Sequence, residues 1–318
     1  MTSKHPGATG HANAVNTPTR TFERGLVTIG MPVRNGATVM ARALDSLLVQ
    51  TWPRFEIVIS DNASTDNTRE LAAEYMRRDP RIRYIRQREN VGARANFAFL
   101  LTVARGEYFM WAAVDDYWDQ HFVEELRSEL EHHRDADLAM SAVERVWPDG
   151  RVCDVVAWQG NEDPTNLSHF SLALKLAKGA PYHLFIYGLY RTAFLVEAFV
   201  GLPGVIALDR LFVCQNALAT RFRYVDKILH RRQVTKIALT ERYKDDDLGR
   251  AWMNWFAEWK LAIVGGLFLA RSKIIPVVRK VYLPLLVGIF AKRAAIGSAV
   301  RLSRKLKTAA KRRSAFLV

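Results

Sequence analysis

The sequence predicts an α/β fold in which a mostly parallel sheet is flanked by helices and followed by a basic amphipathic helical region. Short apolar segments alternate with helical segments between residues 26 and 113, and polar clusters follow three of the apolar segments. Positive charge is concentrated in residues 251–318. The first two observations predict the sheet and its ligand-binding edge, and the third predicts a separate C-terminal region.

The four apolar segments of the first half are predicted to be strands, because they are short and rich in β-branched or aromatic residues. The connections between them are long enough to hold one helix each, so the strands should be parallel and joined by right-handed crossovers. We expect strands at residues 26–31, 55–60, 82–85 and 107–113, and helices at 37–50, 68–78 and 91–104.

The second half should be more mixed. The pattern predicts helices at 121–133, 172–178 and 208–219, and strands at 137–146, 151–158, 185–190 and 222–225. Hydrophobic residues make up 49% of the chain and charged residues 25%, which fits a folded core and argues against a fibrous or disordered protein. Three regions follow from these patterns: a disordered lead at 1–24, an α/β domain at 25–235 and a basic helical region at 236–318.

Polar residues follow three of the predicted parallel strands. They are Arg34-Asn35 after the first strand, Asp61-Asn62 after the second and Asp115-Asp116 after the fourth. The carboxyl ends of parallel strands share one edge of the sheet, which is the natural ligand site of such folds. Two adjacent carboxylates there suit a divalent metal, Mg²⁺ or Mn²⁺, that bridges to a diphosphate. Alternatively, the two acids cap the helix expected to begin near His121.

Five motifs occur in this part of the chain in a fixed order. They are VTIGMPVRNG at 27–36, Leu44-x-x-Leu47-Leu48-x-Gln50-Thr51, FEIVISDNASTDNT at 55–68, DPRIRYIRQRENVGARANFA at 79–98 and ARGEYFMWAAVDDYW at 104–118. Together they resemble family 2 glycosyltransferases of the GT-A fold, strongly over about 95 residues and less closely to about residue 235. The resemblance implies transfer of a sugar from a nucleoside diphosphate sugar to an acceptor hydroxyl with inversion.

The resemblance also implies roles for individual residues. Many relatives have an aromatic residue where Arg34 stands, although a guanidinium can also stack on a base. Asp61 would read the nucleobase or ribose, and it can also form an Asx-turn in its loop. Arg94 would reach a phosphate, or it is a solvated helix residue. The residues implied for nucleotide-sugar binding are Pro32, Arg34, Asn35, Asp61, Asn62, Asn90, Arg94, Asp115 and Arg232, and those implied for the metal are Asp116, as the more direct ligand, and Asp115.

An inverting transfer needs a base that takes the proton of the acceptor hydroxyl. Asp209 matches the family's base at the start of a helix, but Leu208 stands where relatives have a preceding acid. The alternative for Asp209 is a helix N-cap without chemistry. His230 to Gln233 resembles the basic loop that folds over the diphosphate, and the alternative for this segment is a solvated turn.

Within the C-terminal region, residues 251–318 hold fourteen of the 46 Lys and Arg residues and one of the 32 acids, so residues 1–250 are nearly neutral. Its apolar runs, 261–270 and 281–291, are too short to span a bilayer and suit helices lying on an anionic membrane surface. Alternatively the runs pack on the domain, or the basic end binds nucleic acid. We expect no nucleic-acid partner, because the α/β domain has no motif for one.

The combined interpretation is a metal-dependent glycosyltransferase at the inner face of the cell membrane. Residues 1–24 contain no apolar run typical of an export signal, so we expect a cytoplasmic, peripheral protein. The acceptor would be a glycan or lipid-linked glycan in cell-envelope polysaccharide or glycolipid synthesis. Two alternatives are a non-catalytic nucleotide-sugar-binding scaffold and a nucleotidyltransferase on a similar sheet. The second is disfavoured because the chain lacks a Gly-rich, Lys-bearing phosphate loop.

Overall fold

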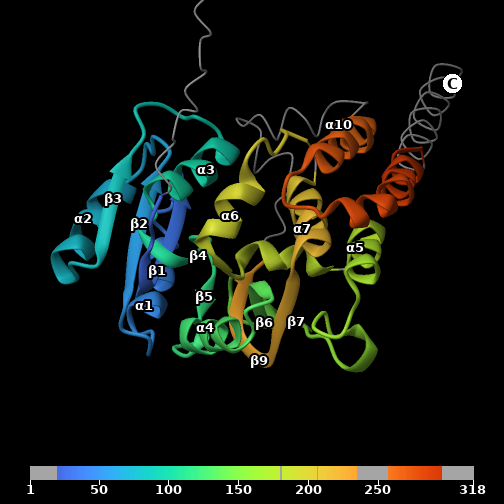
Figure 1. Ribbon diagram of the computed structural model, residues 1–318. Helices are drawn as coiled ribbons and strands as arrows, with labels where there is room; N and C mark the ends of the chain where they lie inside the picture. Colours follow the sequence, from blue (N-terminus) through green and yellow to red (C-terminus); the bar gives the residue numbers. More distant parts are fainter. Residues whose placement is uncertain (1–19, 180, 206, 235–256, 296–318) are drawn as a thin grey trace, which may run out of the picture.

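The structure is a computed structural model that describes residues 20–179, 181–205, 207–234 and 257–295. In these residues one mixed sheet has the strand order β3-β2-β1-β4-β8-β6-β9-β5, and β7 pairs with β6 outside this path (Figure 1). The strands are β1 Glu23–Val33, β2 Phe55–Asp61, β3 Ile82–Arg86, β4 Gly106–Trp111, β5 Tyr117–Trp118, β6 Ala136–Val146, β7 Val152–Val156, β8 Leu189–Arg191 and β9 Arg221–Gln233. The α-helices are α1 Met40–Leu48, α2 Thr68–Arg78, α3 Ala93–Val103, α4 Phe122–His132, α5 His169–Lys178, α6 Thr192–Phe199, α7 Leu208–Ala219 and α10 Ala257–Arg271.

The first four strands are parallel, which confirms the prediction for the first half of the chain. β1 lies between β2 and β4, and β3 pairs with the far side of β2. The chain therefore moves outward from β1 through β2 to β3, and then returns to place β4 on the other side of β1. This reversal creates a topological switch point at the carboxyl ends of β1 and β4, where open α/β sheets bind their ligands.

The second half of the sheet corrects several expectations. Residues 181–187 form a 3₁₀ helix, and the strand expected at 185–190 is reduced to β8. α6 was not expected, because a short, mostly apolar segment does not reveal its period. β9 runs to Gln233 instead of ending at Val225, since its polar end pairs with β6 in parallel and with β5 in antiparallel orientation.

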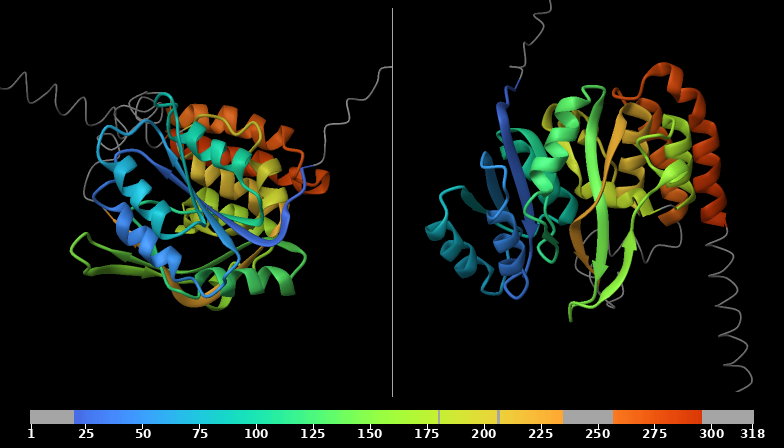
Figure 2. Two further views of the ribbon diagram at one scale, coloured as in Figure 1. Left: turned by 90° about the vertical axis from the view of Figure 1, so that its left-hand side faces the viewer. Right: turned by 90° about the horizontal axis from the view of Figure 1, so that it is seen from below.

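Two hydrophobic cores lie on the two faces of the sheet, and Figure 2 shows the helices on both sides. Side chains alternate along β2, so that Ile57 and Ile59 pack with α1, α2 and α4 while Val58 packs on the face of α3, α6 and α7. The largest fully buried side chain is Trp111 at the end of β4, whose ring contacts Phe97, Phe109 and Phe212. The core that contains Trp111 therefore holds α3 and α7 against β4, the strand that leads to Asp115.

The C-terminal region packs on the α/β domain. α10 and the helical residues 283–295 lie with α5 and α7, on the opposite side of the molecule from α2 and β3 (Figure 1). Leu261 and Leu269 of α10 and Phe290 of the last helix join the core that contains α7. The alternative that the two apolar runs pack on the domain is therefore correct for these faces. Among the described residues, no helix is both long and apolar enough to cross a bilayer.

Two glycines allow α10 to approach its neighbours closely. A Cβ atom at Gly265 would lie 3.2 Å from Cδ1 of Leu211 on α7, and one at Gly266 would lie 2.7 Å from Cγ2 of Val287 in the last helix. α10 thus lies between two helices at distances that larger residues do not permit.

Gly266→Ala should destabilise the protein by about 1–3 kcal/mol, because the added methyl group overpacks the contact with Val287. Gly288→Ala is the matched control, since a Cβ atom there meets nothing within 4 Å. It should leave the protein as stable or stabilise it by up to about 1 kcal/mol through helix propensity. Thermal unfolding of both variants measures the difference, and equal melting temperatures would contradict the close packing of α10.

Candidate active site

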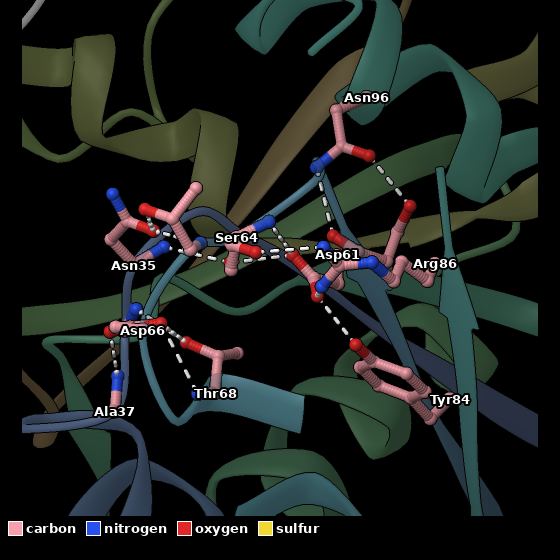
Figure 3. A network of polar contacts seen from close by, with 12 residues as sticks. Asn35, Ala37, Asp61, Ser64, Asp66, Thr68, Tyr84, Arg86 and Asn96 are labelled. Carbon is pink, nitrogen blue, oxygen red and sulfur yellow. Dashed lines mark hydrogen bonds and ion pairs between the residues drawn. The ribbon is translucent and has the colours of Figure 1, made fainter. Parts of the chain in front are cut away.

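The loop after β1 is bound to the loop after β2 by a set of short polar contacts (Figure 3). Asn35 has a positive φ of 55° and donates its backbone N–H to Ser64 Oγ at 2.9 Å, while its side-chain oxygen accepts from Thr65 N at 2.8 Å. The next two N–H groups, of Gly36 and Ala37, donate to the Thr68 hydroxyl and the Asp66 carboxylate. The two loops therefore form one rigid wall.

Asp61 is the centre of this wall. Its carboxylate is fully buried and accepts from the N–H and hydroxyl of Ser64, the hydroxyl of Tyr84 and the guanidinium of Arg86, at distances between 2.5 and 2.9 Å. The contact with Ser64 N confirms the Asx-type turn considered for this loop. Because its oxygens are turned into the protein, Asp61 acts in this structure by shaping the wall.

The protonation states around Asp61 and Asp66 suit these contacts. Burial, with Asp61 beside it, raises the pKa of Tyr84 to about 12, so the phenol keeps the proton that it donates. Burial alone would raise the pKa of Asp66, but hydrogen bonds from the Thr68 hydroxyl and from the N–H groups of Ala37 and Thr68 hold that pKa below its ordinary value. Both networks are therefore formed at neutral pH.

A second contact links β2 to the start of α3. Asn62 donates to Asn90 Oδ1 at 2.7 Å and accepts from Val91 N at 2.8 Å, and Gly92 N donates to the same Asn90 oxygen at 3.0 Å. These bonds fix the segment that precedes α3, whose N-terminus carries a partial positive charge and backbone N–H donors suited to a phosphate.

Arg94 lies in the first turn of α3 and is exposed. Its Nη1 lies 3.4 Å from the carbonyl oxygen of Leu202, and a Cβ atom at Gly204 would lie 3.9 Å from its Nε. Arg94 is thus placed beside the loop that leads into α7.

The acidic pair separates into two environments. Asp116 is only 2% exposed: its Oδ2 accepts from His230 Nε2 at 2.9 Å and its Oδ1 accepts from Gln233 N at 3.0 Å. Asp115 is half-buried beside it. The alternative that this pair caps α4 is wrong for Asp116, because the carboxylate that reaches His121 N at the helix start is that of Asp119.

The end of β9 corrects the expectation of a loop or solvated turn at residues 230–233. His230 is fully buried, its ring is stacked on Trp118, and its Nδ1 has no hydrogen-bond partner among the described residues. Arg231 forms an ion pair with Glu144 at 3.0 Å, and the guanidinium of Arg232 lies 5.8 Å from the centre of the Tyr187 ring. Of the basic residues expected over a diphosphate, Arg232 is therefore the one without an acidic partner in the described residues.

Two loops meet at the switch point between β1 and β4. A Cβ atom at Gly36 would lie 2.5 Å from Val33 Cγ2 and 3.6 Å from Val114 Cγ2, so the Pro32–Gly36 loop contacts the loop that carries Asp115. Pro32 and Asp115 are half-buried, whereas Arg34 and Asn35 are exposed. The structure thus brings the predicted residues of the first and fourth strands to one place.

Asp209 lies in the first turn of α7, where its negative charge favours the helix dipole. The N-cap position is taken by Ala207 with a positive φ of 54°, and Asp209 Oδ1 accepts from Arg210 N at 2.8 Å. The alternative that Asp209 is the N-cap of α7 is therefore wrong, because the N-cap lies two residues earlier. The hydrogen bonds that the described residues give to Asp116 come from β9 and not from Asp209.

Sequence reasoning assigned no role to four residues that hold the site together, namely Ser64, Asp66, Tyr84 and Arg86. It also placed His230 in a loop over the diphosphate rather than against Asp116. Tyr84 and Arg86 alternate with apolar residues on β3, an edge strand, and such a pattern is normally explained by solvent exposure. A signal for Asp66 and Thr68 was present in the Asp-x-Thr spacing that follows the Asx-turn.

A parallel sheet with polar loops at a switch point defines an α/β protein of the Rossmann-like class. Residues 28–168 match the family described as Glycosyl transferase family 2. The chain is 29% identical over 115 residues to glycosyltransferase GlyG of Streptococcus pneumoniae, an alignment that covers 36% of this chain and 38% of GlyG. Over this segment, which is less than half of the chain, the protein is similar to glycosyltransferase family 2.

Solved structures extend the similarity of the fold beyond the family segment. S. aureus TarS 1-349 in complex with UDP-GlcNAc superposes with a TM-score of 0.62 at 18% identity, covering 84% of this chain and 72% of that one. Mannosyltransferase PcManGT from Pyrobaculum calidifontis, in complex with GDP-Man and Mn²⁺, gives a TM-score of 0.51 at 18% identity and covers 90% and 79%. The GT-A fold predicted from the sequence is confirmed.

Asp61→Asn should lower the free energy of unfolding by about 1–3 kcal/mol, because the new amide N–H₂ faces donors and leaves a buried group unsatisfied. Glu89→Gln, an exposed change on the same edge of the sheet, should stay within about 0.5 kcal/mol of the parent. Urea denaturation measures both variants. Equal stability of the two would show that the Asp61 network does not hold the loops.

Proposed function

We propose that the protein transfers a sugar from a nucleoside diphosphate sugar to an acceptor hydroxyl with inversion. The observation that carries the proposal is the junction, at the switch point of a family 2 domain, of the Pro32–Gly36 loop with the loop of Asp115. That crevice is where nucleotides bind in open α/β sheets. The solved GT-A neighbours, whose complexes contain UDP-GlcNAc or GDP-Man, support a nucleotide-sugar donor.

The donor would lie along the wall formed by the first two loops. Pro32, Arg34 and Asn35 would contact the nucleoside, and the rigid turn at Asp61 and Asn62 would complete its pocket. Arg94 would bind the diphosphate together with the N-terminus of α3, and Asn90 would fix the segment between them. Arg232 would reach the diphosphate from the other side, since its guanidinium has no acidic partner in the part of the chain that the structure describes.

A divalent cation, Mg²⁺ or Mn²⁺, fits the acidic pair. Among the described residues no three His, Cys, Asp or Glu side chains are grouped to hold a metal, but such cations are commonly held by one or two carboxylates together with substrate phosphates. When bound, the cation would neutralise charge on the leaving diphosphate. The sequence suggested Asp116 as the more direct ligand. We assign direct contact to Asp115 instead, because each oxygen of the buried Asp116 already accepts a hydrogen bond.

Asp209 would act as the base. As the acceptor oxygen attacks the anomeric carbon, the bond from that carbon to the diphosphate oxygen breaks and the diphosphate leaves with the electron pair. The acceptor's proton passes to the Asp209 carboxylate. Arg94, beside the 202–204 loop, links the donor side of the site to the loop that enters α7.

Asp115→Asn should slow the release of nucleoside diphosphate by more than about 100-fold, since a metal contributes several kcal/mol of charge stabilisation. The measurement uses a panel of UDP-, GDP- and dTDP-sugars with Mn²⁺, and EDTA should abolish the release by the unaltered protein. Asp226→Asn, at an exposed acid of β9, should release the product at the parent rate. Full activity of Asp115→Asn would remove the metal from the proposal.

Asp209→Asn should reduce transfer by about 10²–10⁴-fold while the donor binds with unchanged affinity, because the base acts only on the acceptor. Titration of the donor and measurement of transfer, on the same preparation, separate the two effects. The scaffold alternative, suggested by Leu208 in place of a second acid, predicts donor binding with no transfer by either protein.

The acceptor is proposed to be a lipid-linked glycan or another glycan met at a membrane surface. Supporting this, the packed C-terminal region still presents apolar side chains to solvent: Ile263, Leu267, Val277, Val278, Val281 and Leu285 are between 51% and 82% exposed. Lys273 and Lys280 lie in the same region of the chain. Apolar side chains with basic neighbours suit an interfacial position on anionic lipid.

A further inference from the structure

A cavity of about 650 Å³ lies between α7, α10 and the loop after α6. Its lining includes Val200, Gly201 and Pro203 from that loop, Gln215 from α7, and the last turns of α10. It is separate from the acidic pair and from the wall at Asp61, none of whose residues line it.

The floor of the cavity contains an incompletely satisfied polar group. Gln215 is 1% exposed, and its Nε2 donates to Ser272 Oγ at 2.9 Å, while its Oε1 has no hydrogen-bond partner. Turning the amide over would exchange the two atoms and still leave one of them unpaired. A buried amide oxygen in this state normally accepts a hydrogen bond from a protein group, a water or another bound molecule, so it marks a place where one can bind.

The walls and the mouth of the cavity differ in character. Val264, Leu267 and Phe268 of α10 give it an apolar side, and Leu267 is 52% exposed, so the apolar surface continues to the outside. Arg271 and Lys273 stand at one end, with Glu197 as the acid among the lining residues. The cavity thus combines an apolar channel, a net positive mouth and a buried polar contact.

We propose that this cavity binds a phosphate-bearing lipid, with the chain along the α10 wall, the phosphate at Arg271 and Lys273, and a polar oxygen of the lipid at Gln215. Charge complementarity selects an anionic lipid over a neutral one. This lipid would be the carrier of the acceptor glycan, and that part of the inference rests on the proposed function. Gln215 follows Asp209 on the same helix, about 9 Å along its axis at 1.5 Å per residue, so a lipid held here lies close to the proposed base.

The test measures binding of dodecyl phosphate, below its micellar concentration, to the full chain by calorimetry. Arg271→Gln combined with Lys273→Gln should weaken binding at least tenfold by removing the charged mouth. Val200→Trp, at a rim position that is 71% exposed, should do the same by filling the entrance without disturbing the core. Lys260→Gln, an exposed base on α10 outside the cavity lining, should bind as the parent does.

Two further probes separate the contribution of the phosphate group to binding from that of the alkyl chain. Inorganic phosphate and dodecyl maltoside should each bind at least tenfold more weakly than dodecyl phosphate. Equal binding of inorganic phosphate would reduce the site to an anion site, and equal binding of the maltoside would reduce it to an apolar cavity. Either result overturns the proposal, as does equal binding of dodecyl phosphate to all variants or to none.

Failure of this inference differs from failure of the proposed function. Lipid binding that responds to the variants, in a protein that releases no nucleoside diphosphate from any donor, overturns the transferase and the acceptor role but supports the lipid site. Transfer to a water-soluble acceptor with no binding of dodecyl phosphate overturns the lipid site and supports the transferase.

Discussion

The hydrogen bonds of the fully buried Asp61 carboxylate are the interaction on which the arrangement of the loops after β1 and β2 depends. The carboxylate collects donors from its own loop and from β3, and the same loop then binds the turn at Asn35. A buried charge of this kind is stable only when its oxygens are fully hydrogen-bonded. Once they are, the ends of β1, β2 and β3 have a single arrangement. The wall proposed to bind the nucleotide is therefore preorganised, and a ligand there need not order it.

Asp116 performs the corresponding task on the other side of the switch point. Its two hydrogen bonds reach His230 and Gln233 on β9, so they tie the end of β4 to a strand from the second half of the chain. The stacked rings of Trp118 and His230 enclose this contact. Asp116 thus fixes the loop that follows β4, in which its neighbour Asp115 is half-buried.

Much of the first half could be predicted from the sequence, because its strands and helices have clear periods and its polar residues fall at strand ends. The boundaries of α2 and α7 were predicted to the residue. The sequence could not reveal that Asp61 and Asp116 face inward, since a carboxylate after a strand looks the same whether it meets a ligand or a buried donor. The end of β9 was not predicted either, because His230 and Arg231 are polar and charged residues that favour a loop. This segment forms a strand only through its pairing with β5 and β6, which are distant in sequence. A separate C-terminal region was predicted from its charge, but the packing of its helices depends on the close contacts at Gly265 and Gly266.

The span between Asp116 and its partner has a consequence for the order of folding. His230 follows Asp116 by 114 positions, so a growing chain completes β1 to β4 long before β9 exists. Domains fold from the N-terminus during synthesis, and non-local contacts form last. The parallel half can therefore assemble on its own while the loop of Asp115 has no strand to hold it. The loop between β4 and β5 is thus fixed as one of the last steps of folding, because a chain that ends before β9 lacks the partners of Asp116.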